Sequence, residues 1–244
     1  MTFRLELSDN NIIKNAFESI HKIVDEITMT ADSEALRLNC LSRDHITFIT
    51  MELQKTVFDE YECDKPEKIM IDSTEFIKIL KKCKNTDILE LSTDDSNLIT
   101  VFKGDATRTF KLGLIDMEYD NPQPPLIQYP SEIRLSSTII KDCLDDMAIF
   151  SDKIEFIVDE DYLIVRTDGQ MGDAETKYIH GENIKEVSRS MFSIPRLTDI
   201  FRASKFSKEC CICIGDDMPI KVTFTLPTND GQLNYLLAPR LEEE

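Results

Sequence analysis

Residues 76–102 read FIKILKKCKNTDILELSTDDSNLITVF, a stretch that holds one helical pattern and two strand patterns in a row. Apolar residues recur at helical spacing from Phe76 to Lys82, which predicts a helix. Two short apolar runs follow, Ile88 to Leu91 and Leu98 to Phe102. Between these runs the acidic pair Asp94 and Asp95 favours a tight turn. The stretch therefore predicts a helix followed by two paired strands.

The same order of elements occurs again in the second half of the chain. Arg196 to Ala203 corresponds to the helix, and the runs Cys211 to Ile214 and Ile220 to Thr225 correspond to the strands. The offset between the halves stays at roughly 120 residues, a period that indicates internal duplication. The other elements correspond as well. The extended start Phe3 to Leu7 corresponds to Glu132 to Leu135, and the predicted first helix Ile12 to Ile27 corresponds to Ile139 to Phe150. The alternating runs Ala35 to Cys40 and His45 to Met51 correspond to Ile154 to Val158 and Tyr162 to Thr167, and the closing strand Thr107 to Ile115 corresponds to Leu233 to Ala238. We predict a duplicated α+β fold.

A proline-rich segment separates the two halves. Four prolines lie between Asp120 and Pro130, and their fixed φ and missing amide donors keep such a segment extended and outside regular sheets. We predict an N-terminal domain over residues 1–118, a connecting loop over 119–130 and a C-terminal domain with an acidic tail over 131–244. The loop is either a plain linker or an apolar surface for a partner peptide, formed by Pro124, Pro125, Leu126 and Ile127.

Length and cysteine content place the chain among intracellular proteins with packed cores. The 244 residues suit two domains of ordinary size, and 41% hydrophobic residues suffice for their cores. The seven cysteines are odd in number and suit reduced thiols. The start alternates like a strand and lacks a basic and apolar leader, and no apolar run approaches the roughly 20 residues of a membrane span. We expect a cytoplasmic protein, or a nuclear one in a eukaryote.

Positive charge is concentrated in two segments, although the formal net charge is −18. Thr74 to Lys84 carries four lysines against Glu75 alone, and Pro195 to Lys208 carries four basic residues against Asp199 alone. The acidic remainder repels phosphate over about a Debye length, which argues against indiscriminate adhesion to nucleic acid. For a single helix, a solvated surface is a better interpretation than nucleic-acid contact. Recurrence in equivalent helices lowers the weight of that interpretation without removing it.

The cysteines and histidines do not form a recognisable metal or catalytic pattern. His21, His45 and His180 are scattered, without the spacing of a metal site or a triad. Cys211 and Cys213 share one face of a predicted strand, but no second cysteine pair completes four ligands, so apolar packing is favoured over zinc. We therefore predict no metal ligands and no cofactor.

The remaining patterns also argue against an enzyme. With 7 glycines the chain has no glycine-rich phosphate loop. The acidic pairs at residues 94–95 and 216–217 lie between predicted strands and are interpreted as turns. A metal-dependent nuclease with these carboxylates is the weakest alternative.

The end of the chain is distinctive. Residues 230–244 read DGQLNYLLAPRLEEE, and this ending resembles that of the proliferating cell nuclear antigen family of sliding clamps, particularly its archaeal members. Three other stretches agree with the family: LSRDHI at residues 41–46, FDEYECD at 58–64 and FKLGLID at 110–116. The resemblance covers essentially the whole chain, including the repeat.

This resemblance implies a non-catalytic DNA polymerase processivity factor with two similar DNA-clamp domains per chain. Three subunits would close head to tail around duplex DNA, with helices lining the hole and antiparallel sheets outside. Enclosure lets the DNA contacts be weak and independent of sequence. Asn15 and Leu144 stand where the family often has basic residues, and Asp145 and Asp146 weaken the third helix further. The candidate DNA-facing residues are Lys14, Lys22, Lys78, Lys81, Lys82, Lys84, Lys141, Arg196, Arg202 and Lys205.

The resemblance also implies a subunit interface and a partner surface. Ring closure would pair two sheet edges, because an exposed edge presents free amides and carbonyls. The edges are Thr107, Arg108, Thr109, Phe110, Lys111 and Leu112 of one subunit and Ala174, Glu175, Thr176, Lys177, Tyr178 and Ile179 of the next. DNA polymerase, clamp loader, flap endonuclease and ligase would dock through short apolar and aromatic motifs. Their surface is Leu41, His45, Ile46, Phe48, Pro124, Pro125, Leu126, Ile127, Pro219, Leu236, Ala238 and Pro239, with Leu236 in place of an aromatic residue of some relatives.

Two alternatives to a homotrimeric clamp stay open. One is a clamp subunit that assembles only with different paralogues into a heterotrimer. The other is a protein-interaction scaffold that never surrounds DNA. The oligomeric state separates the first alternative from the homotrimer, and topological retention on DNA separates the second.

Overall fold

The computed structural model describes residues 3–116, 122–182, 184 and 186–240. Residues 119–121 of the predicted loop and residues 241–244 of the predicted acidic tail lie outside this part. The chain forms two compact units: unit 1 comprises Met1–Arg43, Ile49–Pro124 and Leu226–Leu233, and unit 2 comprises Asp44–Phe48, Pro125–Thr225 and Asn234–Glu244. Each unit thus includes a short segment from the other half of the chain.

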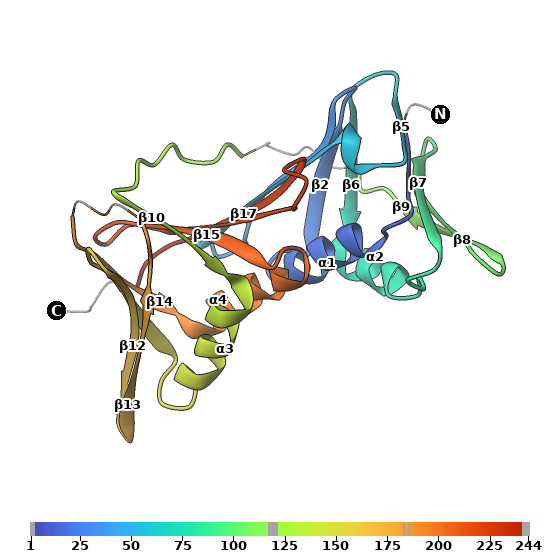
Figure 1. The fold of residues 1–244 in the computed structure, drawn as a ribbon. Helices are drawn as coiled ribbons and strands as arrows, with labels where there is room; N and C mark the ends of the chain where they lie inside the picture. Colours follow the sequence, from blue (N-terminus) through green and yellow to red (C-terminus); the bar gives the residue numbers. More distant parts are fainter. Residues whose placement is uncertain (1–2, 117–121, 183, 185, 241–244) are drawn as a thin grey trace. The chain divides into compact units, whose positions relative to one another are not determined.

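Unit 1 combines two helices with two antiparallel sheets (Figure 1). One sheet has the strand order β5-β1-β7-β8-β9, and in the other β6, β2, β3 and β4 are neighbours in that order. The elements are β1 (Phe3–Leu7), α1 (Asn11–Ile20), β2 (Glu26–Ala31), β3 (Ala35–Leu41), β4 (Thr47–Gln54), the 3-10 turn η1 (Lys55–Val57), β5 (Glu60–Cys63), β6 (Glu67–Asp72), α2 (Ser73–Leu80), β7 (Ile88–Thr93), β8 (Asn97–Lys103) and β9 (Thr107–Gly113).

Unit 2 repeats this plan. One sheet has the order β13-β12-β11-β14, and in the other β10, β15, β16 and β17 are neighbours in that order. The elements are β10 (Ser131–Ser136), α3 (Ser137–Met147), β11 (Lys153–Val158), β12 (Tyr162–Gly169), β13 (Gly172–Ile179), β14 (Ser188–Ser193), α4 (Ile194–Ile200), the 3-10 helix η2 (Phe201–Lys205), β15 (Glu209–Ile214), β16 (Ile220–Thr225) and β17 (Gly231–Leu237). The predicted α+β class is confirmed.

Aromatic and aliphatic side chains of the helices form the core of each unit. In unit 1 the rings of Phe17 on α1 and Phe76 on α2 meet edge to face, with centroids 5.0 Å apart, and both are fully buried. In unit 2 Phe201 of η2 meets Phe224 of β16 in the same way at 5.6 Å. Truncating such a buried ring to alanine costs about 3–5 kcal/mol. The apolar stripes of the sequence thus fix which face of each helix points inward.

The prediction of a helix from Ile12 to Ile27 is wrong at its C-terminal end. Helix α1 stops at Ile20, and the amide of Ile23 donates to the carbonyl of Ile20 in a tighter last turn. Ile27 belongs instead to β2, whose residues pair with β6. Apolar residues continue at helical spacing beyond Ile20 because β2 supplies them at its own period of two.

A short turn joins β7 to β8, and hydrogen bonds to the Asp94 side chain stabilise it. Its carboxylate accepts hydrogen bonds from the backbone N–H of Ser96 at 3.0 Å and of Asn97 at 2.8 Å, and from the Asn97 side-chain amide at 2.9 Å. These bonds, the one from the Ser96 amide above all, lower the Asp94 pKa from 3.8 to about 2. The interpretation of this acidic pair as a turn agrees with the structure.

The depressed pKa predicts an acid-dependent loss of stability. A carboxylate with a lowered folded-state pKa stabilises the fold above its ordinary pKa, and this contribution is lost as pH falls through the folded value. We expect Asp94→Asn to lower the free energy of unfolding at neutral pH and to flatten its decline between pH 3.8 and about 2. Urea titrations across this range measure both effects. The matched control is Asp95→Asn; an equal effect of both variants would contradict the assignment.

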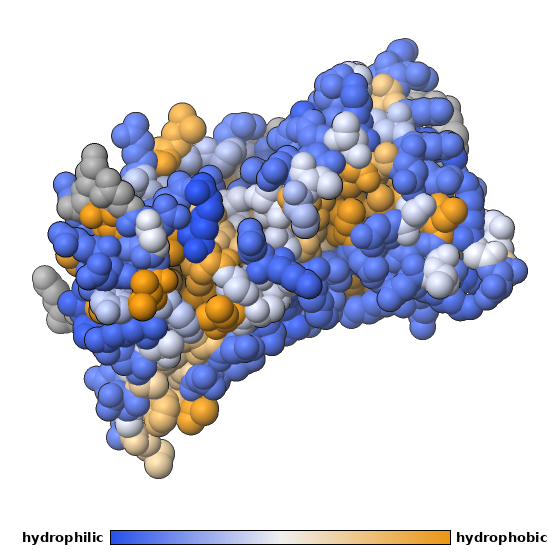
Figure 2. Space-filling view, in the orientation of Figure 1, coloured by the Kyte–Doolittle hydropathy of each residue, from blue (hydrophilic) through white to orange (hydrophobic). Residues whose placement is uncertain are grey.

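The face drawn in Figure 2 is mostly hydrophilic. On the face drawn in Figure 2, hydrophobic residues form separate groups among hydrophilic ones. Among the described residues, no helix has the length and apolar character needed to cross a membrane.

Candidate functional site

The candidate DNA-facing residues of unit 1 lie on α1, α2 and the turns that follow them. Lys78 pairs with Glu75 at 2.6 Å, and Lys84 pairs with Asp105 at 3.2 Å. Lys14 is half-buried, and its ammonium donates to the Cys83 carbonyl at 3.1 Å. Lys14 therefore ties α1 to the segment after α2 in addition to carrying charge.

Three of the candidate DNA-facing lysines of unit 1 are exposed without a compensating carboxylate. Lys22, Lys81 and Lys82 are exposed, and none of them has a carboxylate within 4.0 Å among the residues that the structure describes. His21 lies near two of them: burial, together with the charges of Lys22 and Lys81, lowers its pKa. His21 is therefore neutral at pH 7, and the positive potential here comes from the lysines.

The basic residues of unit 2 are largely neutralised by acidic neighbours. Arg196 bonds to Asp44, Arg202 pairs with Asp199 at 3.1 Å, and Lys141 pairs with Asp145 at 3.4 Å. Lys205 is exposed at the end of η2. Exposed ion pairs contribute only about 0–1 kcal/mol each to stability, so a DNA phosphate could replace the carboxylate partner of these residues. The acidic partners nevertheless make the positive potential around these residues weaker than around the unpaired lysines of unit 1.

The two strands predicted for the subunit interface lie at sheet edges. Strand β9 pairs only with β8, and β13 pairs only with β12, within the described residues. In both strands, exposed and half-buried side chains alternate, and Ile179 at the end of β13 is 82% exposed. Each of these two strands thus has a second edge available for pairing, as do β5, β6, β10 and β14 at the other sheet ends in the described part of the chain.

Some of the predicted interface side chains also stabilise their own unit. Arg108 lies over the Phe102 ring at 5.2 Å and donates to the Lys82 carbonyl at 2.9 Å, so it ties β9 to the end of α2. The Phe110 ring packs against Phe102 with centroids 5.2 Å apart. By contrast, Thr107, Thr109 and Lys111 are exposed on the other side of β9.

The predicted partner surface is partly exposed and partly buried. Leu126 is fully exposed and Ile46 is 40% exposed, and the Ala238 amide donates to the Ile46 carbonyl at 2.9 Å. Phe48 and Leu236 are buried, so they lie beneath the predicted partner surface and are not exposed on it. The remaining members are half-buried or exposed: Leu41, His45, Pro124, Pro125, Ile127, Pro219, Ala238 and Pro239.

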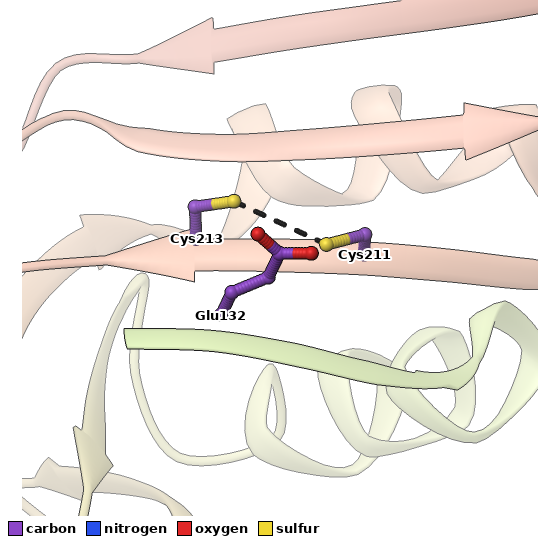
Figure 3. A group of neighbouring side chains, drawn as sticks. All are labelled: Glu132, Cys211 and Cys213. Atoms are coloured by element: carbon purple, nitrogen blue, oxygen red, sulfur yellow. Dashed lines mark hydrogen bonds between the residues drawn. The ribbon is translucent and has the colours of Figure 1, made fainter. Parts of the chain in front are cut away.

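Two further side-chain groups in unit 2 contain residues that the sequence alone did not bring together. A cavity of about 410 Å³ is lined by Glu155, Arg166 and Arg189 among others, and the buried Glu155 carboxylate bonds to both arginines. The second group is Glu132, Cys211 and Cys213, whose ligand atoms lie within 4.8 Å of one another (Figure 3). The sequence placed Cys211 and Cys213 on one face of a strand, and the strand register, with Glu132 opposite Cys213, adds the distant Glu132 to them.

Comparison with known proteins points to one family. Residues 2–123 match the pattern of the proliferating cell nuclear antigen N-terminal domain. A DNA polymerase sliding clamp of Methanobrevibacter smithii is 50% identical over 242 residues, 99% of both chains, and one of Methanothermobacter thermautotrophicus is 46% identical over the same shares. The crystal structure of proliferating cell nuclear antigen from Thermococcus kodakaraensis superposes with a TM-score of 0.92 at 21% identity, covering 98% of this chain and 100% of that one. At this identity the superposition demonstrates a shared fold.

Proposed function

Because the chain belongs to the proliferating cell nuclear antigen family of DNA polymerase sliding clamps, we propose that it forms a homotrimeric ring around duplex DNA. Sliding clamps of this family are non-catalytic processivity factors. The observation that carries the proposal is the pair of half-paired edge strands, β9 in unit 1 and β13 in unit 2. An edge strand presents unsatisfied amides and carbonyls that favour pairing with another chain.

Pairing β9 of one subunit with β13 of the next is a heterologous, head-to-tail contact. Such contacts produce a ring when the rotation between subunits closes and a filament when it does not. The proposed pair is Thr107–Leu112 with Ala174–Ile179. Each subunit contributes one edge to each neighbour, so closure leaves none of these edges exposed.

The basic helices supply the proposed DNA contacts. Lys22, Lys81 and Lys82 are the exposed candidates of unit 1 without a compensating carboxylate among the described residues. Lys78, Lys84 and the paired residues of unit 2 add weaker attraction. Enclosure retains the DNA, so these contacts need only be electrostatic and sequence-independent. The acidic remainder of the surface disfavours binding from outside the ring.

The partner surface would tether replication and repair enzymes. DNA polymerase, clamp loader, flap endonuclease and ligase are the proposed clients, and a short apolar and aromatic motif is the proposed ligand. Tethering turns each rebinding of an enzyme to DNA into an effectively intramolecular event, which raises processivity without catalysis by the clamp. The exposed Leu126 and Ile46 are the apolar contacts available to such a motif.

Truncation of the partner surface should weaken client binding selectively. We expect Leu126→Ala combined with Pro239→Ala to weaken binding of a client motif peptide about tenfold or more, since anchoring contacts contribute about 1–2 kcal/mol each. Ring assembly and retention on DNA should stay unchanged. Titration calorimetry with the peptide measures the effect. The control is Ile149→Ala, another exposed apolar residue; equal weakening in both variants would contradict the location of the surface.

The oligomeric state tests the proposal. Size-exclusion chromatography with light scattering should give a mass about three times the 28.1 kDa of the chain. A stable monomer at micromolar concentration would contradict the homotrimer and favour a clamp subunit that requires different paralogues.

A further inference from the structure

The strongest unassigned feature is the group of Glu132, Cys211 and Cys213 on one sheet of unit 2. Cys211 and Cys213 are two residues apart on β15, so their side chains point to the same face of the sheet. Glu132 on β10 stands directly opposite Cys213 in the antiparallel register, which places its carboxylate on that face too. Figure 3 shows the carboxylate turned toward both sulfur atoms.

The distances in this group match those of a tetrahedral metal site. The two sulfur atoms are 4.0 Å apart. Two Zn–S bonds of about 2.3 Å at a tetrahedral angle span about 3.8 Å, so the sulfurs need to move by only a few tenths of an ångström. The carboxylate oxygen is within 4.8 Å of the sulfurs, and the exposed Glu132 side chain can move to close that distance.

We propose that Glu132, Cys211 and Cys213 bind a thiophilic divalent cation of the zinc class. Two thiolates select soft and borderline metals over Mg²⁺ and Ca²⁺, which prefer oxygen ligands. Three protein ligands leave the fourth tetrahedral position to water or to another exogenous ligand. A cation bound here would link β10 to β15, which are neighbouring strands of one sheet.

Two cationic side chains lie beside the proposed ligands. The two cysteine sulfur atoms share a hydrogen bond, in which either thiol can be the donor. Lys221 lies opposite Cys213 on β16, and Arg134 lies opposite Cys211 on β10. These cations would balance the net negative charge of a cation bound to two thiolates and one carboxylate.

Two neighbouring groups would have to adjust. Arg134 pairs with one Glu132 oxygen at 2.6 Å, which leaves the second oxygen for the metal. Tyr129 lies near Cys213, and its buried hydroxyl has no hydrogen-bond partner among the described residues. That hydroxyl is a candidate donor to a ligand in the fourth position.

Binding exchanges protons for the metal. Each thiol that becomes a ligand releases one proton to solvent, so two cysteines entering as thiols release two protons per cation. No electron is transferred, and the cysteines remain reduced. Affinity should therefore rise with pH.

The experiment uses Co²⁺ and Zn²⁺ with the full-length chain under a non-thiol reductant. We expect one Co²⁺ per chain to give thiolate-to-cobalt charge-transfer absorption in the near ultraviolet, and one equivalent of Zn²⁺ to remove it. Zn²⁺ should also raise Tm, because a ligand that binds the folded state stabilises it. Absence of the charge-transfer band in the wild-type chain would overturn the proposal.

Matched variants locate the site. Cys211→Ser with Cys213→Ser should abolish the band and the Tm shift, and Glu132→Gln should weaken Co²⁺ binding about tenfold or more. Glu132 is exposed, so its variant tests the site without disturbing the core. Cys63→Ser is the control, because Cys63 is a half-buried thiol of unit 1. Retention of the band in the double cysteine variant, or its loss in the Cys63 variant alone, would contradict the assignment.

Discussion

Replacing Thr109 and Ile179 together with aspartate is expected to convert the proposed trimer into monomers and to abolish loading onto DNA. Both side chains are exposed on the proposed edges, Thr109 on β9 and Ile179 on β13. The variant places carboxylates on both sides of every subunit contact, where like charges repel and lose hydration. A penalty of only about 1.4 kcal/mol lowers association tenfold at each contact.

Light scattering measures this change as a fall in mass to that of one chain. The control is Thr86→Asp with Val187→Asp, which adds the same charge at exposed positions outside the two edges. Because the replaced side chains are exposed, the fold of each unit should persist, and circular dichroism checks this. A trimer that survives the edge variant would rule out β9 and β13 as its contacts.

Replacing Lys81 and Lys82 with glutamate is expected to impair loading and processivity while leaving the trimer intact. These lysines are exposed near the end of α2 and have no carboxylate within the ion-pair distance among the described residues, so their charge is available to phosphate. Removing one lysine–phosphate interaction should reduce the slope of log affinity against log salt by about one. With three chains per ring, loading at physiological ionic strength should fall about tenfold or more.

The comparison variants separate position from net charge. Lys65→Glu with Lys153→Glu makes the same change of charge at exposed lysines away from the basic helices. Arg196→Ala should have a smaller effect than Lys81→Ala, because Arg196 is bonded to Asp44. Equal reductions in loading for all of these variants would point to net charge alone and remove the specific role of α2.

The fold class could be predicted from the sequence because helices and strands have different hydrophobic periods, and because these patterns occur in the same order in both halves of the chain. The error at Ile12–Ile27 shows the limit of this argument: apolar residues of a helix and of the following strand merged into one helical period. The short strands β5 and β6 contain few apolar alternations, and their pairing with β1 and β2 supplies what local sequence does not.

For the candidate sites, the sequence predicted only which residues lie on which helix or strand, and not which residues contact one another. The spacing of lysines located the basic faces, but the ion pair of Arg196 with Asp44 and the bond from Lys14 to Cys83 join residues far apart in the chain. The contact of Glu132 with the two cysteines depends on the register of β10 on β15. Residue spacing within one strand does not specify its register against another.

Retention on closed and opened DNA tests the central claim of enclosure most directly. The clamp is loaded onto nicked circular DNA by its loader, the complex is isolated, and the DNA is then cut once. A ring that encloses DNA stays bound to the circle at high salt and dissociates after linearisation, because it slides off the free ends. Equal retention before and after cutting would contradict enclosure and support a scaffold that binds DNA by surface affinity.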